Sequence, residues 1–301
     1  MCAVSGVYAA VITPRREGPE VDLAAAFELV DFVSKAGVAG IVLMGPAGEF
    51  PHFTIEERSR LVALVVKRSR VPVLAGAGHS TFDGALTLAR EAGDAGVAGV
   101  LLMPPHFFRY GPEDVRQFYL RFAERIKGAV PVFLHNAPQF TSPVPCDTAI
   151  ELLATGQFAG IDDASASWED FERLKSAREG HPFALLMGHD ALFARSRAAG
   201  ADGIISGAAS AVPELLVAAD RAIRLGQTER TQMLDCRLRE FLQWMDLFPI
   251  PVAIREAAAL RGLRVGEGAA PLGPESQRRL CEFREWFRGW LPKVEKECSY
   301  E

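Results

Sequence analysis

The chain has 301 residues, of which 49% are hydrophobic and 24% are charged, so it can bury a large core and lacks the composition of a disordered protein. Its formal net charge of -5 argues against nucleic acids and anionic membrane surfaces as partners, because both select basic proteins. No apolar run approaches the ~20 residues that cross a bilayer, and no basic segment followed by an apolar stretch opens the chain. We therefore expect a cytoplasmic protein without a signal peptide.

Short runs rich in Val, Ile and Leu alternate with longer amphipathic stretches, as expected for buried parallel strands joined by helices. The runs are residues 7–13, 40–45, 71–76, 99–104, 130–136, 158–163, 183–188 and 202–207. The helical patterns between them include residues 22–36, 55–68, 82–95 and 112–127. Several have start signals, namely Asp22, Thr54 with Glu57 three residues later, and Pro112 in a first turn.

Three linkers end a helix on glycine and turn directly into a strand, at residues 36–40, 95–99 and 199–203. Such repeated units form either a closed barrel or an open doubly wound sheet. Eight units, with no Gly-x-Gly-x-x-Gly motif after the first strand, favour a (β/α)8 TIM barrel. Later patterns are all helical, at 213–225, 228–247, 251–262 and 274–290. We predict a barrel at residues 1–225 and a three-helix extension at 226–301 packed on it.

The cysteines are scattered and show no Cys-x-x-Cys or other zinc-like spacing. Free thiols in a reducing compartment are the simplest interpretation. The cysteines are Cys2, Cys146, Cys236, Cys281 and Cys298. We expect no metal and no cofactor, and a small-molecule substrate as the principal partner.

Histidines gather just after the predicted strands, where a barrel of this kind places its active site. Loops favour polar residues in any case, so each histidine alone is best interpreted as a loop residue that contacts backbone. The group as a whole indicates ligand binding or proton transfer. Its members are His52, His79, His106, His135 and His189, and only His181 lies elsewhere.

His135 and Asp162 end neighbouring predicted strands. If both point inward, imidazole and carboxylate come within hydrogen-bonding distance at the barrel mouth. A carboxylate that orients an imidazole and raises its basicity is a common general-base arrangement. The alternative is a purely structural His–Asp hydrogen bond. Glu49, after the second strand, is expected to tie loop amides together, because an unpaired buried carboxylate is costly.

The order of the strand-end motifs resembles that of the dihydrodipicolinate synthase and N-acetylneuraminate lyase family of pyruvate-dependent aldolases. The motifs are Thr13-Pro14, Gly45-x-x-Gly48-Glu49, Gly76-x-Gly78, Pro104-Pro105, Asn136-x-Pro138, Gly160-Ile161-x-Asp163, Gly188-x-Asp190, Gly203-Ile204-Ile205-Ser206 and Pro249-Ile250-Pro251-Val252. Each is weak alone, but the order and spacing are specific. The resemblance implies the barrel fold, lyase activity and a homo-oligomer, either a dimer or a tetramer.

The chain departs from this family where the family's chemistry takes place. The resemblance puts Asp162 at the position of the Schiff-base lysine, and an acid cannot form an imine. It puts His135 at the proton-relay tyrosine, and Pro46 and Ala47 at the paired threonines that bind the pyruvate carboxylate. The resemblance also puts Phe107 at the position of the tyrosine that, in this family, a neighbouring subunit contributes to the active site. The arginine that dihydrodipicolinate synthases place soon after Asn-x-Pro is missing.

These departures predict a lyase or related proton-transfer enzyme that acts on a small carbonyl or carboxylate compound without Schiff-base chemistry. The catalytic candidates are His135 and Asp162. The candidate substrate contacts are Ala47, Glu49, His106, Phe107, Asn136, His189, Ile205 and Ser206. A non-catalytic metabolite-binding or regulatory protein is the main alternative. Less favoured are a metal-dependent lyase or hydrolase and an ordinary synthase that recruits another lysine.

Overall fold

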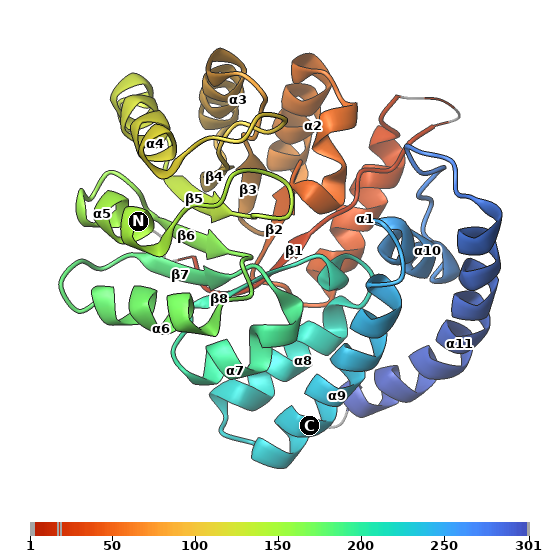
Figure 1. The fold of residues 1–301 in the computed structure, drawn as a ribbon. Helices are drawn as coiled ribbons and strands as arrows, with labels where there is room; N and C mark the ends of the chain where they lie inside the picture. Colours follow the sequence, from red (N-terminus) through yellow and green to blue (C-terminus); the bar gives the residue numbers. More distant parts are fainter. Residues whose placement is uncertain (1–3, 17, 19, 300–301) are drawn as a thin grey trace.

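The computed structural model describes residues 4–16, 18 and 20–299, and Figure 1 shows their arrangement as a barrel of parallel strands inside a ring of helices. Each strand pairs with its neighbours in chain order, and β8 pairs with β1 to close the barrel. The strands are β1 (Gly6–Ala10), β2 (Gly40–Leu43), β3 (Val73–Gly76), β4 (Gly99–Leu102), β5 (Val132–Asn136), β6 (Gly160–Asp163), β7 (Ala184–Met187) and β8 (Gly203–Ser206). The predicted TIM barrel is confirmed.

The outer helices follow the strands in the expected alternation. They are α1 (Leu23–Lys35), α2 (Ile55–Arg68), α3 (Phe82–Ala95), α4 (Pro112–Ile126), α5 (Cys146–Ala154), α6 (Trp168–Ala177), α7 (Phe193–Ala198) and α8 (Pro213–Arg224). The capping box predicted at α2 is present: the Glu57 amide donates to the Thr54 hydroxyl, and the Thr54 amide donates to the Glu57 carboxylate. Asp22 likewise caps α1 through the Ala25 amide.

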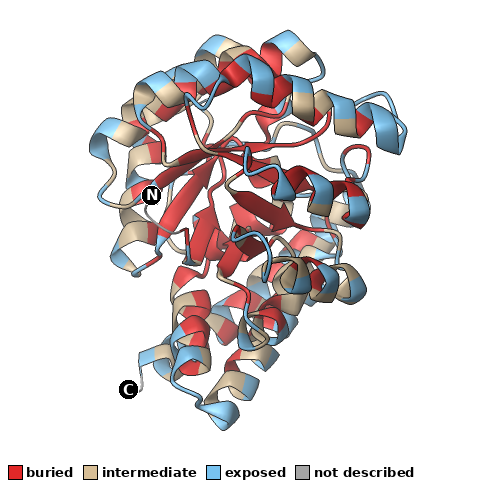
Figure 2. Ribbon diagram, turned by 90° about the vertical axis from the view of Figure 1, so that its left-hand side faces the viewer, coloured by how far each residue is buried: buried red, intermediate tan, exposed pale blue. Residues whose placement is uncertain are grey.

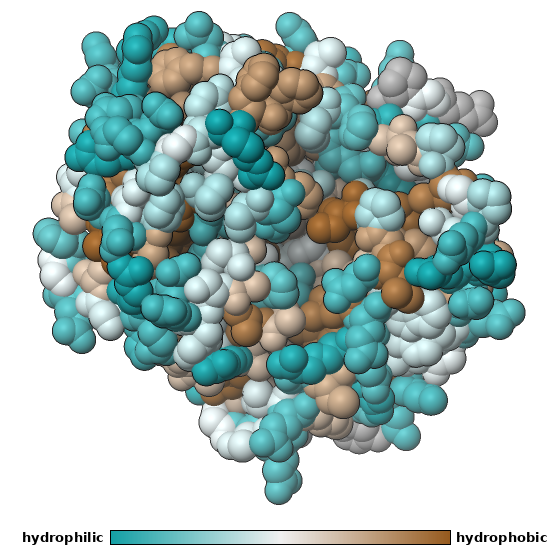
Figure 3. All heavy atoms as spheres, viewed as in Figure 1, coloured by the Kyte–Doolittle hydropathy of each residue, from teal (hydrophilic) through white to brown (hydrophobic). Residues whose placement is uncertain are grey.

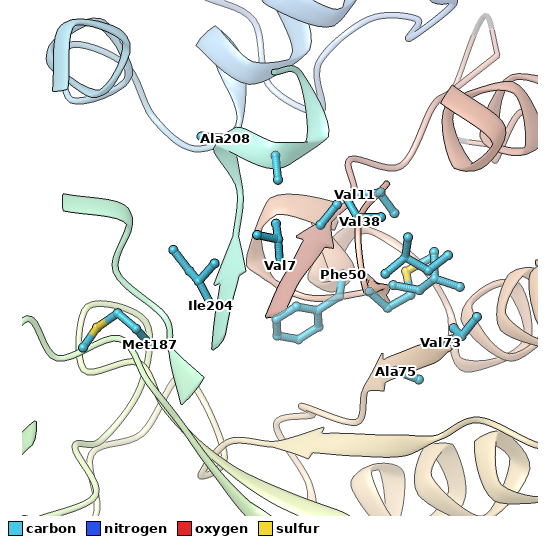
Figure 4. Close-up of a cluster of buried hydrophobic side chains, with 14 of the residues drawn as sticks. Val7, Val11, Val38, Phe50, Val73, Ala75, Met187, Ile204 and Ala208 are labelled. Carbon is cyan, nitrogen blue, oxygen red and sulfur yellow. The ribbon is translucent and has the colours of Figure 1, made fainter. Parts of the chain in front are cut away.

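Alternation along the strands divides the core into two layers. One side chain of each successive pair points into the barrel and the other points toward the helices. The inner layer is small and apolar and comprises Val4, Tyr8, Ala10, Val42, Ala47, Leu74, Leu101, Phe133, Leu186 and Ile205. The outer layer, between strands and helices, is larger; Figure 4 shows part of it, including Val7, Met187 and Ile204. Figure 2 shows that the strands are buried almost throughout, whereas the helices have exposed outer faces.

The C-terminal extension consists of α9 (Thr228–Met245), α10 (Val252–Leu260) and α11 (Pro274–Ser299). An aromatic seam joins α9 to α11, with the Phe241 and Trp290 rings stacked at 5.8 Å between centroids. Helix α11 extends nine residues beyond the predicted end, through Pro292. Proline removes one backbone hydrogen bond, but the burial of Trp290 and Val294 on either side stabilises the helix through it.

Four cysteines, Cys146, Cys236, Cys281 and Cys298, are free thiols, as predicted, and Cys2 lies outside the described residues. None of the described helices combines the length and apolar character needed to span a bilayer.

Candidate functional site

His135 and Asp162 face each other inside the barrel mouth. They are register partners on the adjacent strands β5 and β6, and both occupy inward-pointing positions because Leu134 and Ile161 point outward. The His135 Nδ1 and Asp162 Oδ2 atoms are 2.6 Å apart. Both residues are buried, with 6% and 0% of their surface exposed. The hydrogen bond expected from the order of the strands is therefore present.

Each partner keeps one polar atom unused. His135 Nε2 and Asp162 Oδ1 are buried and have no hydrogen-bond partner among the described residues. Buried polar atoms are almost always paired with protein, water or ligand. The carboxylate accepts the Nδ1 proton, so in the neutral ring Nε2 carries a lone pair. The pair therefore has one basic nitrogen and one carboxylate oxygen without a protein partner at the end of β5 and β6.

The Asp162 carboxylate lies against a glycine of the loop that follows the next strand. A Cβ atom added to Gly188 would lie 2.7 Å from Asp162 Oδ1, closer than carbon and oxygen approach without a bond. Any larger residue here would displace the carboxylate from His135. The added Cβ would also lie 2.8 Å from the Ala164 Cβ atom, so glycine at position 188 is explained by the close approach of both Asp162 and Ala164.

Tyr119, on α4, supports the histidine from behind the sheet. Its buried hydroxyl donates to the Leu102 carbonyl at 2.8 Å and also bonds to the His135 backbone. Burial raises the pKa of Tyr119 well above its ordinary value, so the hydroxyl stays protonated. Tyr119 thus links β4 to β5 at the position of His135. No local pattern indicates this role beyond an aromatic residue on the buried face of a helix.

Ala47 and Ile205 belong to the inner apolar layer at the mouth. Ala47 lies in the 3₁₀ turn η1 (Pro46–Gly48), and Ile205 lies on β8. Figure 3 shows hydrophobic residues gathered around the hollow near the middle of this face. Apolar walls around a buried acid and imidazole strengthen the interaction of those groups with a bound molecule, because little water screens it.

Asn136 points away from this mouth, contrary to its predicted place among the substrate contacts. Its amide donates to Asp163 at 2.8 Å, and its side-chain oxygen accepts from the Val144 amide at 3.0 Å. Asp163 in turn accepts from the Ser165 hydroxyl at 2.9 Å. Asn136 therefore braces the loops after β5 and β6. The period-two alternation of a strand could have revealed this, since His135 and Asn136 cannot both point inward.

Glu49 is also occupied by structural partners rather than open to a substrate. Its carboxylate forms a buried ion pair with Arg255 of α10, and the Arg255 guanidinium also donates to the Thr13 and Val265 carbonyls. The Ala269 amide approaches the second Glu49 oxygen at 3.4 Å. The expectation that Glu49 ties loops together agrees with this arrangement, but its partner comes from the extension and had no sequence signal.

Ser206 and the loop after β7 form a second polar group near Asp162. The Ser206 hydroxyl accepts from the Ala209 amide and donates to the Asp190 carboxylate. Ser206 points outward from β8, so it reaches the mouth only through Asp190. The neighbouring His189 has a buried Nδ1 atom without a partner among the described residues. Burial, opposed by the Ser206 hydrogen bond, raises the pKa of Asp190 from 3.8 to about 6.

The raised pKa makes stability depend on pH. Between pH 3.8 and about 6 the folded protein keeps a proton on Asp190 that the unfolded chain has lost. The contribution of this group to the free energy of unfolding is therefore fully present below pH 3.8 and is lost as the pH rises to about 6. We expect the free energy of unfolding, measured with urea, to fall by about 3 kcal/mol between these limits relative to Asp190→Asn. Parallel pH profiles of the two proteins would contradict this assignment.

His106 belongs to a separate cluster on the β2–β4 side of the mouth. Its ring packs edge-on against Phe50, with 5.4 Å between centroids. Burial, with His79 and Arg58 nearby, lowers the pKa of His106, and burial likewise lowers that of His79. Arg58 is buried and donates to the Gly76 and Gly78 carbonyls. His52 ends the short turn η2 (Phe50–His52) and is exposed. The predicted histidine group is therefore not one cluster: its members lie beside Asp162, near Arg58, after β7 and on the surface.

Phe107 projects from the loop after β4 and is 86% exposed, with a backbone φ of 87°. At this exposure its ring lies in solvent rather than against His135 or Asp162 of the same chain. Phe108 packs edge-on against it, with 5.0 Å between ring centroids.

No three His, Cys, Asp or Glu side chains converge as a potential metal site anywhere in the part of the chain that the structure describes. The donors considered for a metal-dependent reaction, His106, His135, Asp162 and His189, do not form such a group.

Comparison with known proteins agrees with the motif order. The model of the dihydrodipicolinate synthetase family matches residues 3–287. The chain is 32% identical over 286 residues to the 4-hydroxy-tetrahydrodipicolinate synthase of Chlorobium limicola, covering 93% of this chain and 96% of that protein. It is 30% identical over 284 residues to the synthase of the same name from Methanosarcina mazei, covering 94% and 97%.

Solved structures agree with the sequence comparison. The 4-hydroxy-tetrahydrodipicolinate synthase of Methylacidiphilum fumariolicum SolV superposes with a TM-score of 0.88 at 29% identity, covering 98% of this chain and 99% of that one. The dihydrodipicolinate synthase of Thermotoga maritima gives a TM-score of 0.88 at 26% identity, covering 97% and 99%. The family match covers most of the chain, the relatives match over nearly their full lengths, and the barrel is the same. The chain belongs to the dihydrodipicolinate synthetase family.

Proposed function

We propose that the protein is a lyase or related proton-transfer enzyme that acts on a small carbonyl or carboxylate compound without forming a Schiff base. The observation that carries this proposal is the buried His135–Asp162 pair, whose Nε2 atom has no partner among the described residues. A positioned imidazole oriented by a carboxylate contributes a general acid or base to such reactions. The membership of the family supports a lyase.

In the proposed reaction the Asp162 carboxylate accepts a hydrogen bond from the Nδ1–H group and so fixes the tautomer of His135. The Nε2 lone pair takes a proton from a carbon next to a carbonyl, which leaves an enolate. Alternatively it takes the proton of a β-hydroxyl group, whose oxygen then becomes a carbonyl as the adjacent carbon–carbon bond breaks and its electron pair passes to an enolate. The imidazolium that results is stabilised by the Asp162 carboxylate across the 2.6 Å hydrogen bond. His135 then returns the proton to the product carbon or oxygen, and the pair is restored.

The positions of the lysines support a reaction without an imine. No lysine of the chain lies on a barrel strand. Lys35, Lys67, Lys175, Lys293 and Lys296 lie in helices, and Lys127 follows α4. An amine on the outer helices cannot reach a carbonyl held beside His135 within the barrel.

Proton exchange tests the proposal even while the natural substrate is unidentified. A panel of 2-oxo acids, aldehydes, ketones and β-hydroxycarbonyl compounds is incubated with the protein in D2O and followed by proton NMR. We expect catalysed loss of the signal next to the carbonyl, or cleavage, for at least one compound. Saturable binding with neither exchange nor product would contradict catalysis and favour the metabolite-binding alternative.

Pyruvate and borohydride test the imine directly. We expect no covalent adduct by mass spectrometry, because the position of the family's amine carries a carboxylate. A 4-hydroxy-tetrahydrodipicolinate synthase that uses the lysine serves as the positive control. An adduct on any lysine would show that the chain recruits another amine, which contradicts the proposal.

We also propose that the exposed aromatic residues Phe107, Phe108 and Phe140 form an interface with a second copy of the chain. Arg109 ties their two loops together through the Pro138 and Thr141 carbonyls, so the aromatic face is held in place. Exposed apolar patches of this kind commonly mark protein interfaces, and most oligomers are homo-oligomers. We expect sedimentation velocity to show an oligomer that Phe107→Asp dissociates; unchanged sedimentation would place the interface elsewhere.

A further inference from the structure

A cavity of about 810 Å³ lies on the outside of the barrel wall, where α8 and α1 close the ring of helices. These two helices approach each other less closely than α7 and α8 do, and the end of α11 lies over the gap together with the start of α9. Figure 1 shows α11 running down to end beside α8 and α9. The cavity is separated from His135 and Asp162 by the strands themselves.

Part of the cavity wall is apolar. Phe32 of α1, Val217 of α8, and Leu263 after α10 line it, and Leu225 forms part of its edge with 60% of its surface exposed. The Arg261 guanidinium lies over the Phe32 ring, 4.8 Å from its centroid. An apolar surface of this kind in an open cavity favours an apolar ligand body.

Each acidic group in the wall lies in an ion pair, and Glu214 and Glu295 share the single guanidinium of Arg261. Each accepts from an arginine, in the pairs Asp31–Arg68, Glu28–Arg264, Glu214–Arg261 and Glu295–Arg261. The side chains of two cations in the wall, Lys35 and Arg221, form no hydrogen bond or ion pair with any residue that the structure describes. Arg230, also in the wall, donates only to the Glu297 and Cys298 carbonyls. Three cations without an acidic partner therefore outweigh the one carboxylate left in excess by the shared Arg261, and the net charge that faces the cavity is positive.

We propose that this cavity binds a small amphipathic anion, with a carboxylate or sulfonate head near Lys35 and Arg221 and an apolar body against Phe32 and Val217. A volume of about 810 Å³ lies in the range of small-molecule sites. Because α1 and α8 belong to the barrel and α11 to the extension, the bound molecule joins the two parts. Binding only to the folded chain raises its stability through mass action.

Octanoate is a suitable probe, and octan-1-ol, which has the same chain length but no charge, is the control ligand. Calorimetric titration of the full chain with octanoate is expected to show saturable one-site binding, accompanied by a rise in Tm, with octan-1-ol several-fold weaker. Arg221→Glu is expected to weaken octanoate binding roughly fivefold to tenfold, since it replaces an attraction by a repulsion. Val217→Trp is expected to abolish binding by filling the cavity.

Lys67→Glu provides the matched control, because it makes the same change of charge on an exposed position of α2 outside the cavity. Its affinity for octanoate should equal that of the unmodified chain. The proposal is overturned by equal binding of octanoate and octan-1-ol, by equal losses in Arg221→Glu and Lys67→Glu, or by no binding at all. If Val217→Trp does not fold, the exposed Arg221→Glu variant still decides the outcome.

Discussion

Replacing His135 with alanine is expected to lower the rate of proton exchange or turnover by about 100- to 10,000-fold while the barrel remains folded. The Nε2 atom is unpartnered among the described residues, so loss of the ring removes the base. It also leaves the buried Asp162 carboxylate without its hydrogen bond, so stability is measured beside activity. The measurement is the exchange rate by NMR, with circular dichroism and thermal unfolding to establish the fold.

Asp162→Asn tests whether catalysis needs His135 in the correct tautomer or only needs the imidazole ring to be present. An asparagine amide would donate to Nδ1 and shift the histidine proton to Nε2, so that Nε2 could no longer accept a proton. We expect a loss comparable to that of His135→Ala. His181→Ala, at an exposed histidine before β7, is the control and should keep full activity. Full activity in His135→Ala would exclude this residue as the catalytic base.

Breaking the buried pair between Glu49 and Arg255 is expected to cause the largest loss of stability. Arg255→Met leaves the Glu49 carboxylate buried, with only the Ala269 amide at 3.4 Å, and removes donors from the Thr13 and Val265 carbonyls. Removing one partner of a buried pair costs about 3–5 kcal/mol, because the remaining charge stays out of water. Urea unfolding measures the free energy.

The double variant Glu49→Gln/Arg255→Met tests the cause. It removes both charges, so it should be more stable than Arg255→Met alone, and the difference measures the cost of the unpaired acid. Arg279→Met, which breaks the exposed Arg279–Glu275 pair on α11, is the control and should cost at most about 1 kcal/mol. Equal losses in Arg255→Met and Arg279→Met would show that burial adds nothing.

Several elements follow closely from local pattern. Helix α2 begins at the residue predicted from Thr54 and Glu57, because both capping-box hydrogen bonds form within four residues of chain. The predicted strands are a little too long, as at residues 11–13 after β1, since apolar residues continue into loops that still pack on the core. The predicted end of α11 comes too early, because only packing against other helices stabilises a turn that contains proline.

The meeting of His135 and Asp162 could be predicted because barrel strands pair in chain order, and residues at the ends of adjacent strands then lie side by side. The Asn136 side chain is bonded to Asp163 and the Val144 amide instead of pointing inward with His135, and alternation along β5 already indicated this direction. Arg255 could not have been found in this way. Its partner Glu49 is 206 residues away in the sequence, and no local pattern encodes a contact over that separation.

Local sequence therefore establishes the repeated strand–helix units, the barrel they form, and the adjacent positions of His135 and Asp162 at strand ends. These depend on periodicity, capping and strand order, which act over a few residues or through adjacent strands. Tertiary packing decides which strand-end residues face the mouth, which acids are paired, and that burial raises the pKa of Asp190 to about 6. These properties depend on desolvation and on contacts between distant segments, which exist only once the chain is folded.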